Sequence, residues 1–186
     1  MTADGTIIPP HGGYQKLKSY QMAEIVYDAT VKFCARFIDR RSRTVDQMVQ
    51  AARSGKQNIA EGSMASGTSK ETELKLVSVA RASLEELLLD YQDFLRQHAL
   101  CLWAKDHPSA QKIRQLAWQS NRSYLTYSTF IEESPAEFAA NTMICLLHQT
   151  SYLLDQQLHQ LERQFLLEGG FRERLYNARK NIRDKR

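Results

Sequence analysis

The residues of this chain that could do chemistry are mainly cations, and they are concentrated at its C-terminus. Residues 171–186 hold seven of the 25 Lys and Arg residues but only two of the 21 Asp and Glu residues, which gives this segment a net charge of +5. The first 170 residues sum to −1. Cations placed in this way can neutralise phosphates and release counterions, so the tail is a candidate for binding nucleic acid. A solvated, frayed chain end is the alternative interpretation.

Further cations lie between the first two expected helices and along the second. Contacts from Lys and Arg to phosphate position a nucleic acid without reading its sequence. Nearby, Asn58 and Glu61 are expected instead to bond backbone groups at a helix junction, as such side chains commonly do. The nine candidate phosphate contacts are Arg40, Arg41, Arg43, Arg53, Lys56, Arg172, Arg174, Arg179 and Lys180.

Residue types that catalyse reactions do not converge in any motif. No serine occupies a G-x-S-x-G turn, and the glycine-containing stretch 62–67 lacks the known phosphate-loop patterns. Cys145 and His148 lie one helical turn apart, as do His98 and Cys101, but a zinc site needs about four converging ligands. We therefore expect no catalytic residue, no metal and no other cofactor, and predict that the protein is not an enzyme. The alternative is a small hydrolase with a carboxylate site that no motif marks.

The cysteines and the apolar runs indicate the compartment. Cys34, Cys101 and Cys145 are odd in number and widely separated, which argues against a disulfide framework and for a reducing environment. The N-terminus lacks the layout of a signal peptide, and no apolar run approaches the roughly 18 residues of a membrane span. A soluble, cytoplasmic protein that does not contact a membrane is expected.

Apolar residues recur at helical spacing almost throughout, which predicts an all-α fold with a flexible leader over residues 1–13. The tail continues this pattern with Phe171, Leu175, Ala178 and Ile182, so it is expected to form a short helix. At about 50 Å the last long helix could extend past a compact bundle and offer apolar surface to another subunit. The predicted helices cover residues 14–38, 44–62, 69–96, 108–130 with a break near Asn121, and 135–168.

Several residues mark where these helices meet or end. Gly55 lies inside the second helix, where a close approach of another helix would explain it. Thr68 and Glu71 match a capping box, and Ser134-Pro135-Ala136-Glu137 combines an N-cap, a proline at the first position and an acid at the third. Gly169-Gly170 should end the last long helix.

An aromatic group in the fourth helix has two interpretations. Tyr124, Tyr127 and Phe130, beside Arg122, could stack on unpaired bases. Aromatic side chains three residues apart on a helix are more often part of the core, and the core interpretation is favoured.

The second and third helices carry a resemblance to a known family. Asn58-Ile59-Ala60-Glu61-Gly62, followed by Ser69-Lys70-Glu71 and the run from Val79 to Leu87, resembles the four-helix-bundle proteins first associated with intervening sequences in 23S ribosomal RNA genes. The same family contains the accessory variability proteins of diversity-generating retroelements. The similarity covers residues 14–127, and residues 134–174 resemble the C-terminal extension of a longer subfamily.

The resemblance implies an up-down four-helix bundle over residues 14–130, a suffix helix over 131–170 and a basic tail over 171–186. It also implies assembly into a homopentameric barrel without known catalysis. The retroelement members bind nucleic acid and contact a reverse transcriptase. This chain differs at Gly55-Lys56-Gln57, where apolar and proline-containing residues are more usual, and its bundle is near neutral. The difference in charge moves the expected contacts to the tail and to Arg40–Arg43.

The leading hypothesis is a non-enzymatic, oligomeric accessory protein that binds RNA or DNA, beside a nucleic-acid enzyme such as a reverse transcriptase. The alternative is an oligomeric protein-binding scaffold, in which the long last helix packs on a partner and the tail only solubilises it.

Overall fold

The computed structural model describes residue 8 and residues 10–184, and in that range the regular structure is entirely helical, as predicted. Most of the predicted leader over residues 1–13, and Lys185 and Arg186 of the tail, lie outside the described residues. The elements are η1 (Tyr14–Lys16), α1 (Lys18–Phe37), α2 (Arg43–Ala65), α3 (Lys70–Gln97), α4 (Pro108–Leu116), α5 (Tyr124–Glu132), α6 (Ala136–Glu168) and α7 (Phe171–Arg183).

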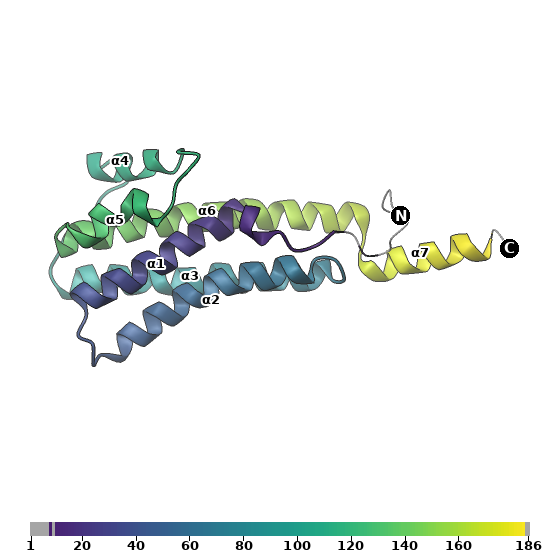
Figure 1. Cartoon of the computed structure of the whole chain (residues 1–186), viewed down its shortest axis with the longest axis horizontal. Coiled ribbons are helices and arrows are strands. Elements are labelled where there is room, and N and C mark those ends of the chain that lie inside the picture. Colours follow the sequence, from purple (N-terminus) through teal and green to yellow (C-terminus); the bar gives the residue numbers. More distant parts are fainter. Residues whose placement is uncertain (1–7, 9, 185–186) are drawn as a thin grey trace.

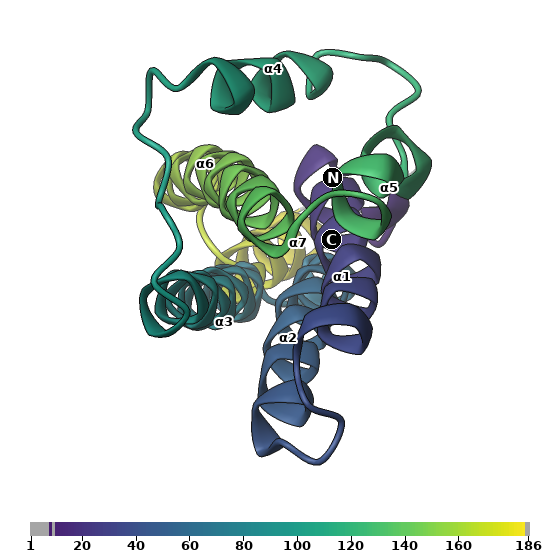
Figure 2. The same cartoon turned by 90° about the vertical axis from the view of Figure 1, so that its left-hand side faces the viewer.

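Four of these helices form an elongated up-down bundle (Figure 1). Helices α1, α2, α3 and α6 alternate in direction, and each packs against two neighbours around the bundle axis (Figures 1 and 2). The all-α bundle is therefore confirmed. The identity of its fourth helix differs from the expectation, because α6 occupies the position expected for residues 108–130. Residues 131–170 are thus part of the bundle and not a helix added after it.

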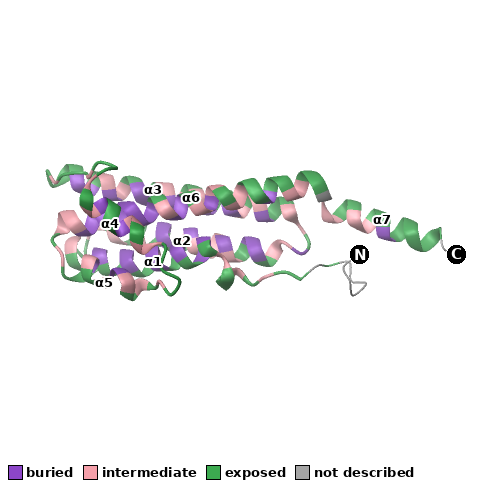
Figure 3. Ribbon diagram, turned by 90° about the horizontal axis from the view of Figure 1, so that it is seen from above, coloured by how far each residue is buried: buried purple, intermediate pink, exposed green. Residues whose placement is uncertain are grey.

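Buried residues lie mainly on the inner faces of the four helices (Figure 3). Near the C-terminal ends of α1 and α3, the ring of Phe33 makes T-shaped contacts with Tyr91 and Phe94, with centroids 4.8 and 5.0 Å apart. The hydroxyl of Tyr91 donates to Thr30 Oγ1 at 3.1 Å, and Thr30 in turn donates to the carbonyl of Val26. Both buried hydroxyls are thereby satisfied, which removes the cost of burying them.

Helices α2 and α3 approach closely at Gly55. A Cβ atom at this position would lie 2.6 Å from Leu84 Cδ2 and 2.7 Å from Leu84 Cγ, so only glycine fits without a shift of Leu84. The close approach inferred from the sequence is confirmed. Gly62 is also buried against α3, and α2 continues through it to Ala65, three residues beyond its predicted end.

Helix ends follow the expected residues in some places and shift by a residue or more in others. Ser69, not Thr68, caps α3, since its Oγ accepts a hydrogen bond from Thr72 N at 3.1 Å. Ser134 does not cap α6, because its hydroxyl donates to the carbonyl of Thr129. The end of α6 at Gly169 is confirmed, and this glycine has a positive φ of 67°. At the other end of the chain, α1 begins at Lys18 because residues 14–16 form a 3-10 turn.

Residues 98–135 leave the bundle and return over its outer face. The predicted break falls at residues 117–123; α4 lies against α6, and α5 against both α1 and α6 (Figure 2). Asn141 on α6 holds the start of this excursion, since its side chain accepts from Trp103 N and donates to the carbonyl of Cys101. Residues 139–147 of α6 are consequently buried on all sides.

The aromatic group of α5 belongs to the core. Tyr127 is fully buried, Phe130 packs on Phe138, and the hydroxyl of half-buried Tyr124 donates to Glu132. Arg122 donates to the carbonyl of Ala117 and so holds the α4–α5 loop. The core interpretation is therefore confirmed.

Candidate nucleic-acid interface

The connector between α1 and α2, here taken to include Arg43 at the start of α2, carries three of the predicted phosphate contacts. Arg40, Arg41 and Arg43 are all exposed. Asp39 accepts a hydrogen bond from the amide of Arg41 at 2.9 Å, and Ser42 caps α2 through the amide of Thr44. Arg43 is the first residue of α2 and lies at the positive end of the helix macrodipole. An anion bound there would stabilise this end of the helix.

Carboxylates partly offset the charge of this connector. Arg43 shares a groove of about 420 Å³ between α2 and α3 with Asp46 and Glu86. Together with Asp39, these groups lower the local positive potential. The connector region is therefore less positive than its three arginines alone would make it.

Arg53 and Lys56 lie in the middle of α2 and differ in environment. Arg53 is exposed, whereas Lys56 is half-buried with its Nζ 4.6 Å from the ring centroid of Tyr27 on α1. This cation–π contact gives Lys56 a role in the packing of α1 on α2. Asn58 donates to the carbonyl of Ser54, so the expected side-chain bond to backbone is present, although inside α2 and not at its end.

Helix α7 begins at the α2–α3 turn and projects beyond the end of the bundle (Figures 1 and 3). Its N-terminal turn is fixed by Glu173, whose carboxylate accepts from the amide of Gly170 at 2.5 Å. Arg174 donates to the carbonyl of Gly67 at 3.5 Å and is half-buried. Arg174 therefore lies between α7 and the α2–α3 turn, where it is less accessible than the exposed cations of the helix.

The two sides of α7 differ in chemistry. Its apolar side holds Phe171, Leu175 and Ala178, and Ala178 is buried with 8% exposure. At about 100° per residue, four cations leave the helix within an arc of about 100° on another side. All four are exposed, and among the described residues none of them forms an ion pair with a carboxylate within 4 Å. These four cations, here called the cationic face, are Arg172, Arg179, Lys180 and Arg183.

The cationic face begins beside α3. The pKa of the Glu71 carboxyl is lowered mainly by Lys75, which is hydrogen-bonded to it at 2.6 Å, and the charge of Arg172 lowers it further.

Arg183 also lies on the cationic face, although it is not one of the nine candidate contacts that the sequence indicated. The signal was its spacing of three and four residues from Lys180 and Arg179, which places it on the same side of a helix.

The predicted cations do not form one surface. The connector lies at one end of the bundle and α7 at the other (Figure 1). The 23 residues of α2 alone separate them by about 35 Å. Arg53 lies between the two ends.

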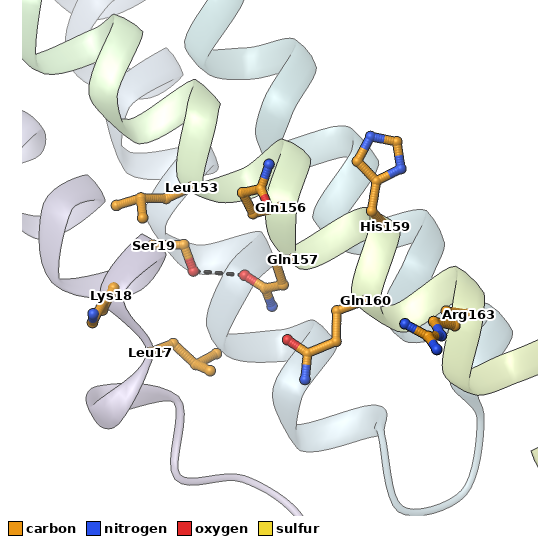
Figure 4. Close-up of a pocket in the computed structure, with 9 residues that line it drawn as sticks. All are labelled: Leu17, Lys18, Ser19, Leu153, Gln156, Gln157, His159, Gln160 and Arg163. Atoms are coloured by element: carbon orange, nitrogen blue, oxygen red, sulfur yellow. Dashed lines mark hydrogen bonds between the residues drawn. The ribbon is translucent and has the colours of Figure 1, made fainter.

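A polar groove of about 460 Å³ lies where α1 begins against α6 (Figure 4). Ser19 Oγ donates to Gln157 Oε1 at 2.6 Å, and Gln156 and Gln160 line the same wall. His159 contributes to the lining but lies 3.9 Å from Glu162 outside it. The groove offers amide and hydroxyl groups that can form hydrogen bonds, together with the cations of Lys18 and Arg163. None of its described lining residues carries a carboxylate.

Other chemistry-bearing groups are dispersed or buried. In the part of the chain that the structure describes, no group of three or more His, Cys, Asp and Glu residues is placed to hold a metal ion. Burial raises the pKa of the Cys34 thiol to about 12, with a further contribution from Asp90, and burial likewise raises that of Cys145 to about 11. None of the described helices has both the length and the apolar character that a membrane crossing requires.

Comparisons with protein-family models, with curated proteins and with solved structures found no match to this chain.

Proposed function

We propose that this chain is a non-catalytic helical-bundle protein that binds RNA or DNA, with α7 as its main contact. The observation that carries the proposal is the cationic face of α7. Its four cations are exposed, and among the described residues none forms an ion pair with a carboxylate, whereas Arg43 shares a groove with Asp46 and Glu86. Cations that are not paired with a carboxylate retain their counterions until a polyanion replaces them, and this release favours binding.

Salt dependence of binding tests this proposal. Full-length protein should bind a labelled nucleic acid at about 50 mM salt, and the logarithm of its affinity should fall with log salt at a slope near −3 to −4 if four phosphates are contacted. Replacing the four cations of α7 with glutamine should remove most of this affinity and flatten the slope. No binding at low salt, or binding indifferent to salt, would overturn the proposal.

A control variant separates the site from the overall charge. Four other exposed cations can be replaced by glutamine, so that the net charge falls by the same amount. If this variant weakens binding as much as the α7 variant, the contact is nonspecific and α7 is not the site. The control positions are Lys32, Lys105, Lys112 and Arg163.

The proposal includes self-association and a protein partner. Large apolar side chains are exposed, among them Trp118 at 89% and Leu125 at 79%, and such residues often mark protein contacts. The resemblance implies a homopentamer, and a nucleic-acid enzyme such as a reverse transcriptase as partner. The three unpaired cysteines suit a cytoplasmic location. Light scattering tests the oligomer, and a monomeric mass at working concentration would exclude it.

A protein-binding scaffold is the second candidate, favoured by Leu166 and Leu167 at the end of α6, each 76% exposed. Deleting residues 171–186 distinguishes the two functions. Loss of nucleic-acid binding with unchanged assembly supports the first. The second is supported if the full-length protein binds no nucleic acid and replacing Leu166 and Leu167 with glutamine abolishes assembly.

A further inference from the structure

The cationic face of α7 has an aromatic ring near its centre. Tyr176 follows Arg172 by four residues and precedes Arg179 and Lys180 by three and four. At about 100° per residue, its side chain leaves the helix within about 60° of each of the four cations. Its side chain is 62% exposed.

Packing within the protein does not account for this position. The side of α7 that meets the rest of the molecule is marked by buried Ala178 and by Arg174, which reaches Gly67. Tyr176 lies on another side of the helix. Among the described residues it forms no hydrogen bond and no ring contact. An exposed tyrosine among cations therefore has its ring face available for a ligand.

The chemistry of this arrangement suits an unpaired base. In a duplex the base faces are stacked on one another, whereas a single strand exposes them to aromatic side chains. Cations beside the ring would contact the phosphates that flank the stacked base. We propose that α7 binds single-stranded nucleic acid in preference to duplex, with Tyr176 stacking on an unpaired base. This inference rests on the proposed function and specifies its ligand.

The test uses the full-length protein and fluorescence anisotropy with two probes. One probe is a single strand of roughly 12 nucleotides, and the other is a duplex of the same length. Tyr176→Ala should weaken binding of the single strand roughly tenfold or more and leave duplex binding unchanged. The salt slope should not change, because the substitution removes no charge. Tyr176→Phe keeps the ring and should bind like the original protein.

Two controls make the result specific. Tyr152 on α6 is 63% exposed and lies outside α7, so Tyr152→Ala should have no effect on either probe. Alanine favours helix more than tyrosine does, so unravelling of α7 would not explain a loss, and circular dichroism verifies this. Replacing Arg179 and Lys180 with glutamine should weaken binding to both probes.

The outcomes separate this inference from the function on which it rests. If the charge variant loses affinity but Tyr176→Ala binds the single strand normally, the inference is wrong and the proposed function stands. Equal weakening of both probes by Tyr176→Ala would also overturn it. If the original protein binds neither probe at low salt, the proposed function itself is wrong.

Discussion

Asp90 on α3 is a residue whose ionised side chain lowers the stability of the folded protein. Partial burial raises the pKa of its carboxyl, and the charges of Glu86 and Asp93, one turn away on either side, raise it further. The folded protein therefore holds this proton to a higher pH than the unfolded chain does. As the pH rises above the ordinary aspartate value, the unfolded chain ionises first and the stability of the fold decreases.

Replacing Asp90 with asparagine should therefore stabilise the protein at neutral pH. The gain should be less than about 1 kcal/mol, because the carboxyl is partly solvated and water screens the repulsion. It should vanish below pH of about 3.9, where aspartate is protonated in both states. Urea denaturation at the two pH values measures the difference. Asp155→Asn is the control: Asp155 pairs with Arg81 at 3.2 Å and is not among the charges that act on Asp90, so its loss should not stabilise. A gain for Asp90→Asn that persists at low pH would contradict the electrostatic cause.

The three thiols should differ sharply in reactivity. Cys101 is exposed, whereas Cys34 and Cys145 are buried and have pKa values raised to about 12 and 11. Only the thiolate is nucleophilic, so one equivalent of thiol should react rapidly with a chromogenic disulfide at pH of about 8. Three equivalents should react after unfolding, and Cys101→Ser should abolish the rapid phase. Rapid reaction of two or more thiols in the native protein would contradict this arrangement of the core.

Single residues show where sequence patterns determine structure and where they compete. Gly55 and Gly169 were interpreted correctly because a missing side chain and a positive φ leave few alternatives. Thr68 and Ser69 are neighbours with similar capping ability, and the sequence could not distinguish them. The hydroxyl of Ser134 donates to the carbonyl of Thr129 in α5 instead of capping α6, and the sequence pattern does not show this contact.

At the scale of elements, helix length could have indicated which helix completes the bundle. The periodicity of residues 108–130 resembles that of a bundle helix, but it breaks into α4 and α5 of nine residues each. Each spans about 14 Å, against about 42 Å for the 28 residues of α3. Only α6, with 33 residues, can line the full length of its neighbours. Where the short helices lie depends on side-chain contacts such as those of Asn141, which no local pattern shows.

Because Gly55 and Leu84 touch across the α2–α3 contact, the effects of substituting them on stability should depend on each other. Gly55→Ala gains up to about 1 kcal/mol of helix propensity, but its Cβ would overlap the fully buried Leu84 side chain. We expect a net loss of about 1–3 kcal/mol, as for other overpacked cores. In a Leu84→Ala background, the same substitution should be neutral or stabilising. Thermal or urea denaturation of the four proteins measures the coupling, and additive effects would show that the contact is looser than described.

At the scale of the whole molecule, two basic ends lie far apart on one rigid bundle. If the connector and α7 each contact phosphates of a long strand, their contributions to the binding free energy should be independent. Replacing Arg40 and Arg41 with glutamine should cause a smaller loss than replacing Arg179 and Lys180, since Asp39 lies beside the connector. The two losses should sum within about 0.5 kcal/mol in the combined variant, measured by titration. A larger deviation would mean that the ends act together.

The sequence predicted the class of fold and the chemistry of the tail, because apolar periodicity and charge are local properties. It could not place the connector and the tail at opposite ends of the molecule. That arrangement depends on the pairing of α2 with α3 and on the entry of α6 into the bundle.

The place of α6 in the bundle also has a consequence for the newly made chain. Helices α1, α2 and α3 leave the ribosome before residues 98–135, and the helix that closes their apolar side is synthesised only afterwards. Until then the nascent protein exposes the hydrophobic faces of these helices, to which chaperones or neighbouring chains can bind. A stop codon between residues 98 and 135 should therefore yield an insoluble product and not a smaller working domain.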